Sequence, residues 1–280
     1  DFDVEIDEID VTPLQIQGPL SEDVMVDVVG DAVSDLPYYG LLAAEIGGAP
    51  VIVSQTGFSG EAGYEIYVQD AMENAERVYD PVLASVKEHG GMAIAPGHHR
   101  RIAAGILSWG QDMDHETSPF EVNLGYHVRD DKAGDYIGKE ALEAQKAQVE
   151  AGEYPFALKL IGLKMAGKPI QEYATDFWLI SDPDSGEEVG YVTSPWWNPE
   201  LETNIALGFV PAATLQAATD TPLNDEIYGE ELDVEFAVHL PDEYAETPGE
   251  PVFATVAPVP FKESVNASAR EQEKLGIDIS

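Results

Sequence analysis

The second half of the chain carries the pattern that most restricts its fold. From about Tyr154 onward, short apolar runs recur at regular spacing, separated by Gly, Pro, Asn and Asp, with almost no helical periodicity. Such spacing is typical of a small all-β sandwich or barrel. The first half instead mixes strand and helix periodicities, which favours an α+β segment. With the junction near 150–155, we expect three parts: an α+β core at 1–150, an all-β domain at 151–263 and a polar tail at 264–280.

Local signals predict the strands of the first half. Residues 2–6 alternate apolar and acidic side chains, which is the period of a half-buried strand. A second strand is expected over 12–19, where it ends at a Gly-Pro break. Gly47 and Gly48 are expected to form the tight turn of a hairpin between two apolar strands.

Helical spacing predicts the remaining elements of the first half. Ser21 can cap a short helix over 22–29. Residues 71–91 carry helical spacing that ends at glycines, and Pro81 is expected to kink or divide this helix. Two further helices are expected, at 98–105 and 138–150.

The charge of the chain constrains its surroundings. The 280 residues include 53 acidic and 14 basic ones, for a formal net charge of −39. With 44% apolar residues and the acids spread along the chain, this is a folded protein with an acidic surface rather than a disordered acidic tail. Repulsion among so many negative charges destabilises the compact state. Salt weakens this repulsion, because the screening length falls to roughly 3 Å at 1 M. We therefore expect a halophilic protein of a salt-rich cytoplasm.

Composition also excludes several classes of function. Nucleic-acid binding needs a basic footprint that this chain lacks. It has no cysteine, and no apolar run approaches the length of a membrane span. The six histidines show no metal-binding spacing, so we expect no metal site. No P-loop, nucleophile elbow or dinucleotide fingerprint follows a strand.

Three stretches could carry chemistry. The segment "SQTGFSGEAGYEIYV" (54–68) places three glycines beside aromatic and acidic residues, although glycine weakens a strand interior. "PGHHRR" (96–101) is a dense basic cluster where a helix should begin, and such a start attracts anions. Alternatively, Arg100 and Arg101 pair with nearby carboxylates. The stretch 108–125 is too long and irregular for a simple connector, which favours a functional loop.

These stretches resemble the glycine-cleavage T-protein (aminomethyltransferase) family. "TGFSGEAGYEI" is similar to the family's T-G-Y-T-G-E-x-G-[YF]-E-I signature, and "QIQGP" and "IGKEAL" resemble landmarks in the same order. "GYVTSPWWNPELETNIALGFVP" (190–211) resembles a segment of the family's C-terminal barrel. The resemblance covers about 8–262. It implies a folate-binding core with antiparallel sheets and helices, followed by a β-barrel.

One run resembles a narrower group. "PGHHRRIAAGILSWGQDMD" is similar to the P-N-x-x-x-R-I-E-G-G-x-L-S-Y-G-N-D-M run of folate-dependent demethylases such as dimethylsulfoniopropionate demethylase. The first arginine of the family pattern falls on Gly97, and the second is kept as Arg101. The resemblance mildly favours removal of a methyl group from a sulfonium, O-methyl or N-methyl compound over aminomethyl transfer.

The resemblance implies tetrahydrofolate as cofactor and a small methyl or aminomethyl donor as substrate. Glu65 matches the family's pterin-reading glutamate, whose carboxylate can accept two N–H bonds from the amino-pyrimidine edge. Phe58 takes the motif's aromatic position, and Tyr64 and Trp109 are expected as further walls. Arg101 or its basic neighbours would face the anionic folate tail. The glycines would let the backbone approach the ligand.

Chain order implies a missing part. In the family, the segment resembling 1–19 lies well into the protein, so about the first third has no counterpart here. That third carries the aspartate proposed to assist catalysis, so no catalytic residue is assigned. Three alternatives follow: the chain is a processed or truncated fragment, a second polypeptide supplies the rest, or it is a split relative that no longer catalyses. We expect dimerisation or a partner to cover the exposed apolar surface. Two alternatives are a folate-binding regulatory protein without turnover and the folate module of a sarcosine or dimethylglycine oxidase.

Overall fold

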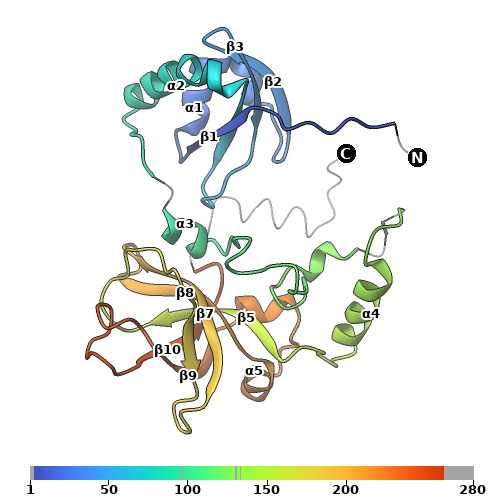
Figure 1. Cartoon of the computed structure of the whole chain (residues 1–280), viewed down its shortest axis with the longest axis vertical. Coiled ribbons are helices and arrows are strands. Elements are labelled where there is room, and N and C mark those ends of the chain that lie inside the picture. The colour runs from blue at the N-terminus through green and yellow to red at the C-terminus, as the bar shows by residue number, and fades with distance from the viewer. Residues whose placement is uncertain (1–2, 96, 130, 133, 262–280) are drawn as a thin grey trace. The chain divides into compact units, whose positions relative to one another are not determined.

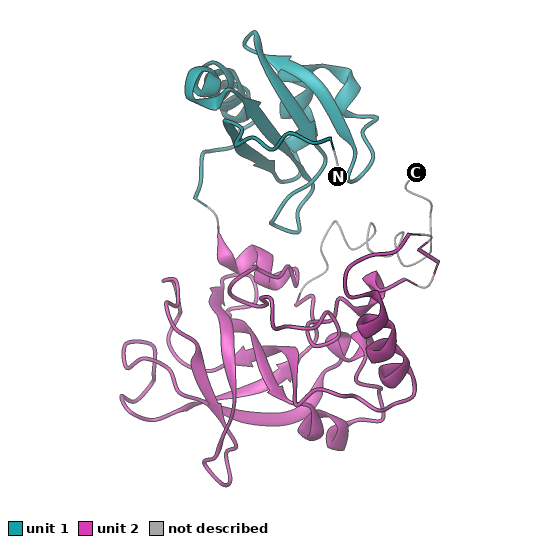
Figure 2. Cartoon of the chain, turned by 45° about the vertical axis from the view of Figure 1, so that its right-hand side comes forward, with its two compact units in different colours: residues 1–96, 264–280 teal, residues 97–263 magenta. Residues whose placement is uncertain are grey.

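The computed structural model describes residues 3–95, 97–129, 131–132 and 134–261 (Figure 1). They form two compact units, divided between residues 96 and 97 (Figure 2), and each is described by itself. Unit 1 precedes this point and unit 2 follows it, to residue 263. This division by contacts differs from the junction expected near 150–155. The domain bounds based on that junction stay a prediction. The expected polar tail, 264–280, lies outside the described residues.

Unit 1 is an antiparallel sheet with two helices packed on one face. The strand order is β1-β4-β3-β2, and the core joins one face of the sheet to the helices. Val24 and Met25 of one helix and Val78 and Val82 of the other are buried in it. The elements are β1 (Val11–Gln17), α1 (Ser21–Val29), the 3₁₀ turn η1 (Asp31–Val33), β2 (Leu41–Ile46), β3 (Ala49–Ser54), β4 (Gly63–Gln69) and α2 (Ala71–Glu88).

Two expectations for the start of unit 1 are wrong. Residues 3–10 form no strand, and Val4 and Ile6 are exposed. An alternating pattern forms a strand only when it finds a partner, and β1 pairs with β4 while the segment before it pairs with no described strand. Ser21 does not cap α1 either, because Leu20 is the N-cap residue and the Ser21 hydroxyl donates to Ala62 O at 3.2 Å.

The hairpin and the long helix fit together at Gly47. Gly47 and Gly48 have φ values of 59° and 74°, as a two-residue hairpin turn requires, so the expected hairpin is confirmed. Pro81 lies within a continuous α2 and does not divide it. The carbonyl oxygen four residues earlier, Arg77 O, would be 2.1 Å from a Cβ at residue 47. Glycine there lets the turn pack against the stretch of helix that precedes Pro81.

Unit 2 is built on a closed antiparallel barrel with the strand order β10-β5-β8-β7-β6-β9. Its interior is a continuous apolar cluster that includes Ile161, Leu163, Ile180, Ala206 and Val238. The expected all-β domain is therefore a barrel, and the α+β class is confirmed. The strands are β5 (Leu158–Met165), β6 (Trp178–Ser181), β7 (Glu188–Asn198), β8 (Thr203–Pro211), β9 (Leu232–Val238) and β10 (Val252–Ala257).

Short helices surround the barrel. Val149 packs with Phe120 and Val128 in a separate small cluster, while Ala212 and Leu215 join the barrel core. Among the described residues, no helix has the length and apolarity to span a bilayer. The helices are α3 (His98–Ala103), α4 (Lys139–Glu150) and α5 (Ala212–Ala218), with 3₁₀ turns η2 (Gly125–His127) and η3 (Asp225–Gly229).

Candidate functional site

Glu65 lies on the face of the unit 1 sheet that α1 and α2 do not cover. In β4, the buried Tyr64, Ile66 and Val68 alternate with the partly exposed Glu65 and Tyr67. Because successive side chains of a strand point to opposite faces, Glu65 and Tyr67 lie on the face away from the helical core. The Glu65 carboxylate, in β4, is therefore partly exposed to solvent on this face of the sheet.

Three hydrogen-bond donors hold the Glu65 carboxylate. Gln15 Nε2, on the neighbouring strand β1, donates to Oε1 at 3.0 Å. The Thr56 hydroxyl donates to Oε2, and the Tyr67 hydroxyl approaches the same oxygen at 3.3 Å. Burial, followed by the negative charge of Glu65, raises the pKa of the Tyr67 hydroxyl, which keeps this donor protonated. The carboxylate is thus oriented before any ligand arrives.

Gln17 explains the glycines of the motif. Its Nε2 donates to Ile16 O at 3.1 Å and to Thr56 O at 3.3 Å, and its Oε1 accepts from the Ser59 hydroxyl at 2.6 Å. A Cβ at residue 57 would lie 2.1 Å from Oε1, and one at residue 63 would lie 2.3 Å from Nε2. Gly57 and Gly63 therefore make room for the Gln17 amide, which ties the loop before β4 to β1. These two glycines thus have a packing reason, and the expectation that the motif's glycines let the backbone approach a ligand stays a prediction.

The two aromatic residues expected beside Glu65 lie in different environments. Tyr64 is 2% exposed in the core of unit 1, with its hydroxyl 3.4 Å from Val33 O. Because it lies on the opposite face of the sheet from Glu65, it does not line one cavity with that residue. Phe58 is 41% exposed in the loop that precedes β4, in the same unit as Glu65.

Arg101 belongs to a buried ion pair rather than to an anion-binding surface. It is 1% exposed, and its Nη1 donates to Asp112 Oδ2 at 2.8 Å and to Ile106 O at 3.1 Å. Its Nη2 donates to Gln111 Oε1 at 3.0 Å and to the Ser194 hydroxyl at 2.8 Å. The alternative of a pair with a nearby carboxylate is thus the one observed. These bonds lie within unit 2, and the expected contact of Arg101 or its basic neighbours with a folate tail stays a prediction.

The same cluster anchors the irregular stretch 108–125. Asp112 is fully buried and also accepts from Ser108 N at 2.8 Å and from the Thr193 hydroxyl at 2.6 Å. Trp109, expected as a ligand wall, projects from this anchored loop, is 60% exposed and lies edge-on to His115 with 5.0 Å between ring centroids. A large exposed aromatic side chain on a fixed loop is a suitable ligand contact.

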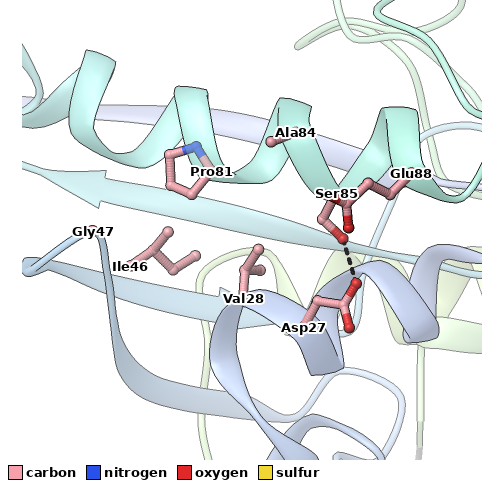
Figure 3. A pocket seen from close by; sticks show the side chains of 8 residues that line it. All are labelled: Asp27, Val28, Ile46, Gly47, Pro81, Ala84, Ser85 and Glu88. Atoms are coloured by element: carbon pink, nitrogen blue, oxygen red, sulfur yellow. Dashed lines mark hydrogen bonds between the residues drawn. The ribbon is translucent and has the colours of Figure 1, made fainter.

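Each unit also contains a hollow whose lining does not include Glu65. One of about 240 Å³ in unit 2 is lined by residues that include Gln111, Tyr173 and Phe177. The other, of about 450 Å³, lies in unit 1 against α1 and α2 (Figure 3). Among the described residues, no group of three His, Cys, Asp or Glu side chains could hold a metal ion.

Sequence reasoning missed Gln17, Thr56 and Asp112. Gln17 stood in the quoted "QIQGP" run, but its contacts with Ser59 and Thr56 span 42 and 39 positions. Asp112 stood in the quoted "GQDMD" run, 11 positions after Arg101. Two signals could have helped: Gly63 lies opposite Gln17 in the β1–β4 pair, and Asp112 follows Arg101 at a distance that a loop can close.

Comparisons with known proteins agree with this fold. The GCVT N-terminal domain model matches residues 1–132, and the glycine cleavage T-protein C-terminal barrel domain model matches residues 159–261. A solved structure of the glycine cleavage system aminomethyltransferase T from Bartonella henselae superposes with a TM-score of 0.65 at 20% identity. It covers 91% of this chain and 60% of the other, and at that identity it shows the fold.

Two kinds of curated relative are equally similar. An aminomethyltransferase from Thermotoga sp. is 35% identical over 213 residues, and the dimethylsulfoniopropionate demethylase of Ruegeria pomeroyi is 34% identical over 219 residues. Each match covers 75% of this chain and 54% of the relative. The chain thus spans about half the length of these relatives, and identity alone does not separate the two activities.

Proposed function

This chain belongs to the glycine cleavage T-protein family, and from that membership we propose that it is the folate-binding part of a tetrahydrofolate-dependent group-transfer enzyme. The transferred group is a methyl or aminomethyl group from a small donor. The high acid content supports a working place in the salt-rich cytoplasm of a halophile. The observation that carries the proposal is the oriented Glu65 carboxylate.

The geometry around Glu65 supports pterin recognition. A carboxylate offers about four lone-pair sites, and the protein donors use one at Oε1 and two at Oε2. Among the described residues no other donor reaches Oε1, so one of its sites is open for a ligand N–H. A second ligand N–H on Oε2 would displace the longest of the protein bonds, from Tyr67. A two-pronged pterin contact then keeps the Gln15 and Thr56 bonds that orient the carboxylate.

Most of the rate enhancement would come from placing N5 of the folate next to the carbon that the donor transfers, and from excluding water from both. Phe58 is the proposed apolar contact in unit 1, and Trp109 stays a prediction for unit 2. Arg101 and Tyr64 are buried in their own units, and their expected ligand contacts stay predictions. No residue is assigned to proton transfer. A second polypeptide or a second copy of the chain as partner remains part of this proposal.

Two other functions remain as alternatives. A folate-binding regulatory protein would bind the ligand without turnover, and a folate module would act within a sarcosine or dimethylglycine oxidase. The similarity to the demethylase, together with the "ILSWGQDMD" run, favours methyl transfer over these, while the equal similarity to aminomethyltransferases leaves aminomethyl transfer as the second candidate.

The test is a calorimetric titration with 5-formyltetrahydrofolate, a stable folate, in molar KCl. We expect micromolar binding that Glu65→Gln abolishes, since an amide cannot accept two N–H bonds through charged oxygens. Glu45→Gln is the matched control, because it removes the same charge from β2 on the same face of the sheet. Equal binding by the wild type and Glu65→Gln would refute the assignment of Glu65, and no binding by either would refute folate recognition by this chain.

A further inference from the structure

A second ligand site is suggested by the hollow on the helical side of unit 1. It has a volume of about 450 Å³ and lies between the last turns of α1 and α2 and the turn of the β2–β3 hairpin (Figure 3). Glu65 lies on the other face of the sheet, so the two places are separate. This site does not depend on the folate proposal.

Part of the lining of the hollow is apolar. Val28 from α1, Ile46 from β2, and Pro81 and Ala84 from α2 contribute carbon surface on facing sides, as Figure 3 shows. Such a lining stabilises a ligand in proportion to the apolar surface that it removes from water. A purely ionic ligand would gain nothing from it.

The rim of the hollow is negative. Asp27 Oδ2 accepts from the Ser85 hydroxyl at 2.8 Å and lies 2.8 Å from His89 Nε2 (Figure 3 shows the Ser85 bond). These two bonds, that of His89 first, lower the pKa of the Asp27 carboxyl, so it is ionised at neutral pH. Every described hydrogen bond of Asp27 is made at Oδ2, which leaves Oδ1 available. Within the described residues, the Glu88 carboxylate makes no hydrogen bond or ion pair.

Two helix ends add to this negative potential. Asp27 lies in the last turn of α1 and Glu88 closes α2, so the carbonyl ends of both helices lie at the rim. The partial negative charge of a helix C-terminus favours cations. The last turn of α1 holds no basic residue, and that of α2 holds Lys87.

These features restrict the chemistry of the ligand. Carboxylates and helix C-termini repel anions. A bound metal ion needs more ligands than this rim offers, since no three candidate metal ligands cluster among the described residues. We propose that this hollow binds a small organic ammonium ion, with its charged head between Asp27 and Glu88 and its alkyl part against Val28, Ile46, Pro81 and Ala84.

The experiment titrates the full chain in molar NaCl, followed by amide chemical shifts, with n-butylammonium, butyrate and ammonium as probes. High salt screens the long-range attraction of cations to the net negative charge, so the binding that remains reports contacts within the hollow. We expect saturable butylammonium binding with a dissociation constant on the order of millimolar, about tenfold tighter than ammonium, with shifts concentrated at residues 27–28 and 84–88. Butyrate should produce no saturable shift.

Variants separate this site from general attraction to an acidic protein. Glu88→Gln should weaken butylammonium binding at least threefold, and Val28→Thr should weaken butylammonium without changing ammonium. Glu76→Gln is the matched control, because it removes one charge from an exposed position of α2 outside the hollow. The proposal is wrong if Glu76→Gln weakens binding as much as Glu88→Gln, or if butylammonium binds no tighter than ammonium.

Discussion

Arg101 and Asp112 form a fully buried ion pair, with 2.8 Å between Nη1 and Oδ2. Their side chains are 1% and 0% exposed, so neither charge is solvated by bulk water. Instead, hydroxyls of Thr193 and Ser194 on β7 and the backbone of the loop complete the hydrogen bonding. The pair therefore joins α3, the following loop and the barrel.

Breaking this pair should strongly destabilise unit 2. Asp112→Asn leaves the Arg101 charge buried without its counter-ion, so we expect the free energy of unfolding to fall by ~3–5 kcal/mol. Urea titration in molar salt, followed by circular dichroism, measures the change. Asp114→Asn is the control, because Asp114 is exposed and bonds to its neighbours Glu116 and Thr117. A loss no larger than the control's would show that the pair contributes little.

Gly57 and Gln17 should show strong energetic coupling. Gly57→Ala places a Cβ 2.1 Å from Gln17 Oε1, and the three nearest atoms all belong to the Gln17 side chain. We expect a loss of about 1–3 kcal/mol from this overpacking and a separate loss from Gln17→Ala. The double variant should lose less than the sum, because the clash vanishes with the side chain. Urea titrations of the four proteins test this, and additive losses would contradict the packing explanation.

Tyr67→Phe tests how the Glu65 carboxylate meets a ligand. The Tyr67 bond at 3.3 Å is the longest of the three, and a second ligand N–H on Oε2 must replace it. Folate affinity should therefore stay the same or rise in Tyr67→Phe, whereas Thr56→Val, which removes the donor that orients Oε2, should weaken binding about tenfold. Calorimetry with 5-formyltetrahydrofolate measures both. Equal weakening in the two variants would mean that Tyr67 orients the carboxylate as well.

Lys159 should make stability rise with pH. Its ammonium is buried and donates to Phe120 O at 2.6 Å, and burial lowers the pKa of Lys159 from 10.5 to about 8. Between these values the unfolded chain binds more protons than the folded one, so the free energy of unfolding increases with pH. From about pH 8 to about pH 9.5 the gain is about 1.5 kcal/mol.

The variant Lys159→Met isolates this effect. It removes the titrating group, so its unfolding free energy should no longer rise over the same pH range. Lys164→Met, on the exposed side of β5, should retain the wild-type rise. Urea titrations at several pH values give the comparison. A rise that persists in Lys159→Met would assign the pH dependence to other groups.

Local patterns predicted local structure well. The Gly47-Gly48 turn, the helices and the change to short strands follow from spacing and turn chemistry, and the structure confirms them. The strand expected at 2–6 failed in its described part because pairing depends on a partner that alternation cannot reveal. Pro81 was expected to kink or divide its helix, but α2 runs through it without a break.

The candidate site was predictable only in part. Glu65 was chosen from its motif and stays a prediction as a ligand contact. The structure places it, partly exposed, on the face of the sheet away from the helices. The burial of Arg101 was not readable from the sequence, because its partner Ser194 lies 93 positions away on a barrel strand. Tyr64 and Glu65 are neighbours in sequence, and the pleat of the strand alone separates them onto opposite faces.

The two units differ in how they can associate with other chains. The barrel is closed and presents no free edge, whereas the unit 1 sheet ends in β1 and β2. Unpaired edges recruit further strands, but five of the eight residues at 3–10, just before β1, are acidic. A second copy adding at that edge would bring like charges together. At 1 M salt the screening length is roughly 3 Å, so this repulsion is largely removed. Concentrated salt therefore favours the compact fold, but it also leaves the β1 edge less protected against self-assembly.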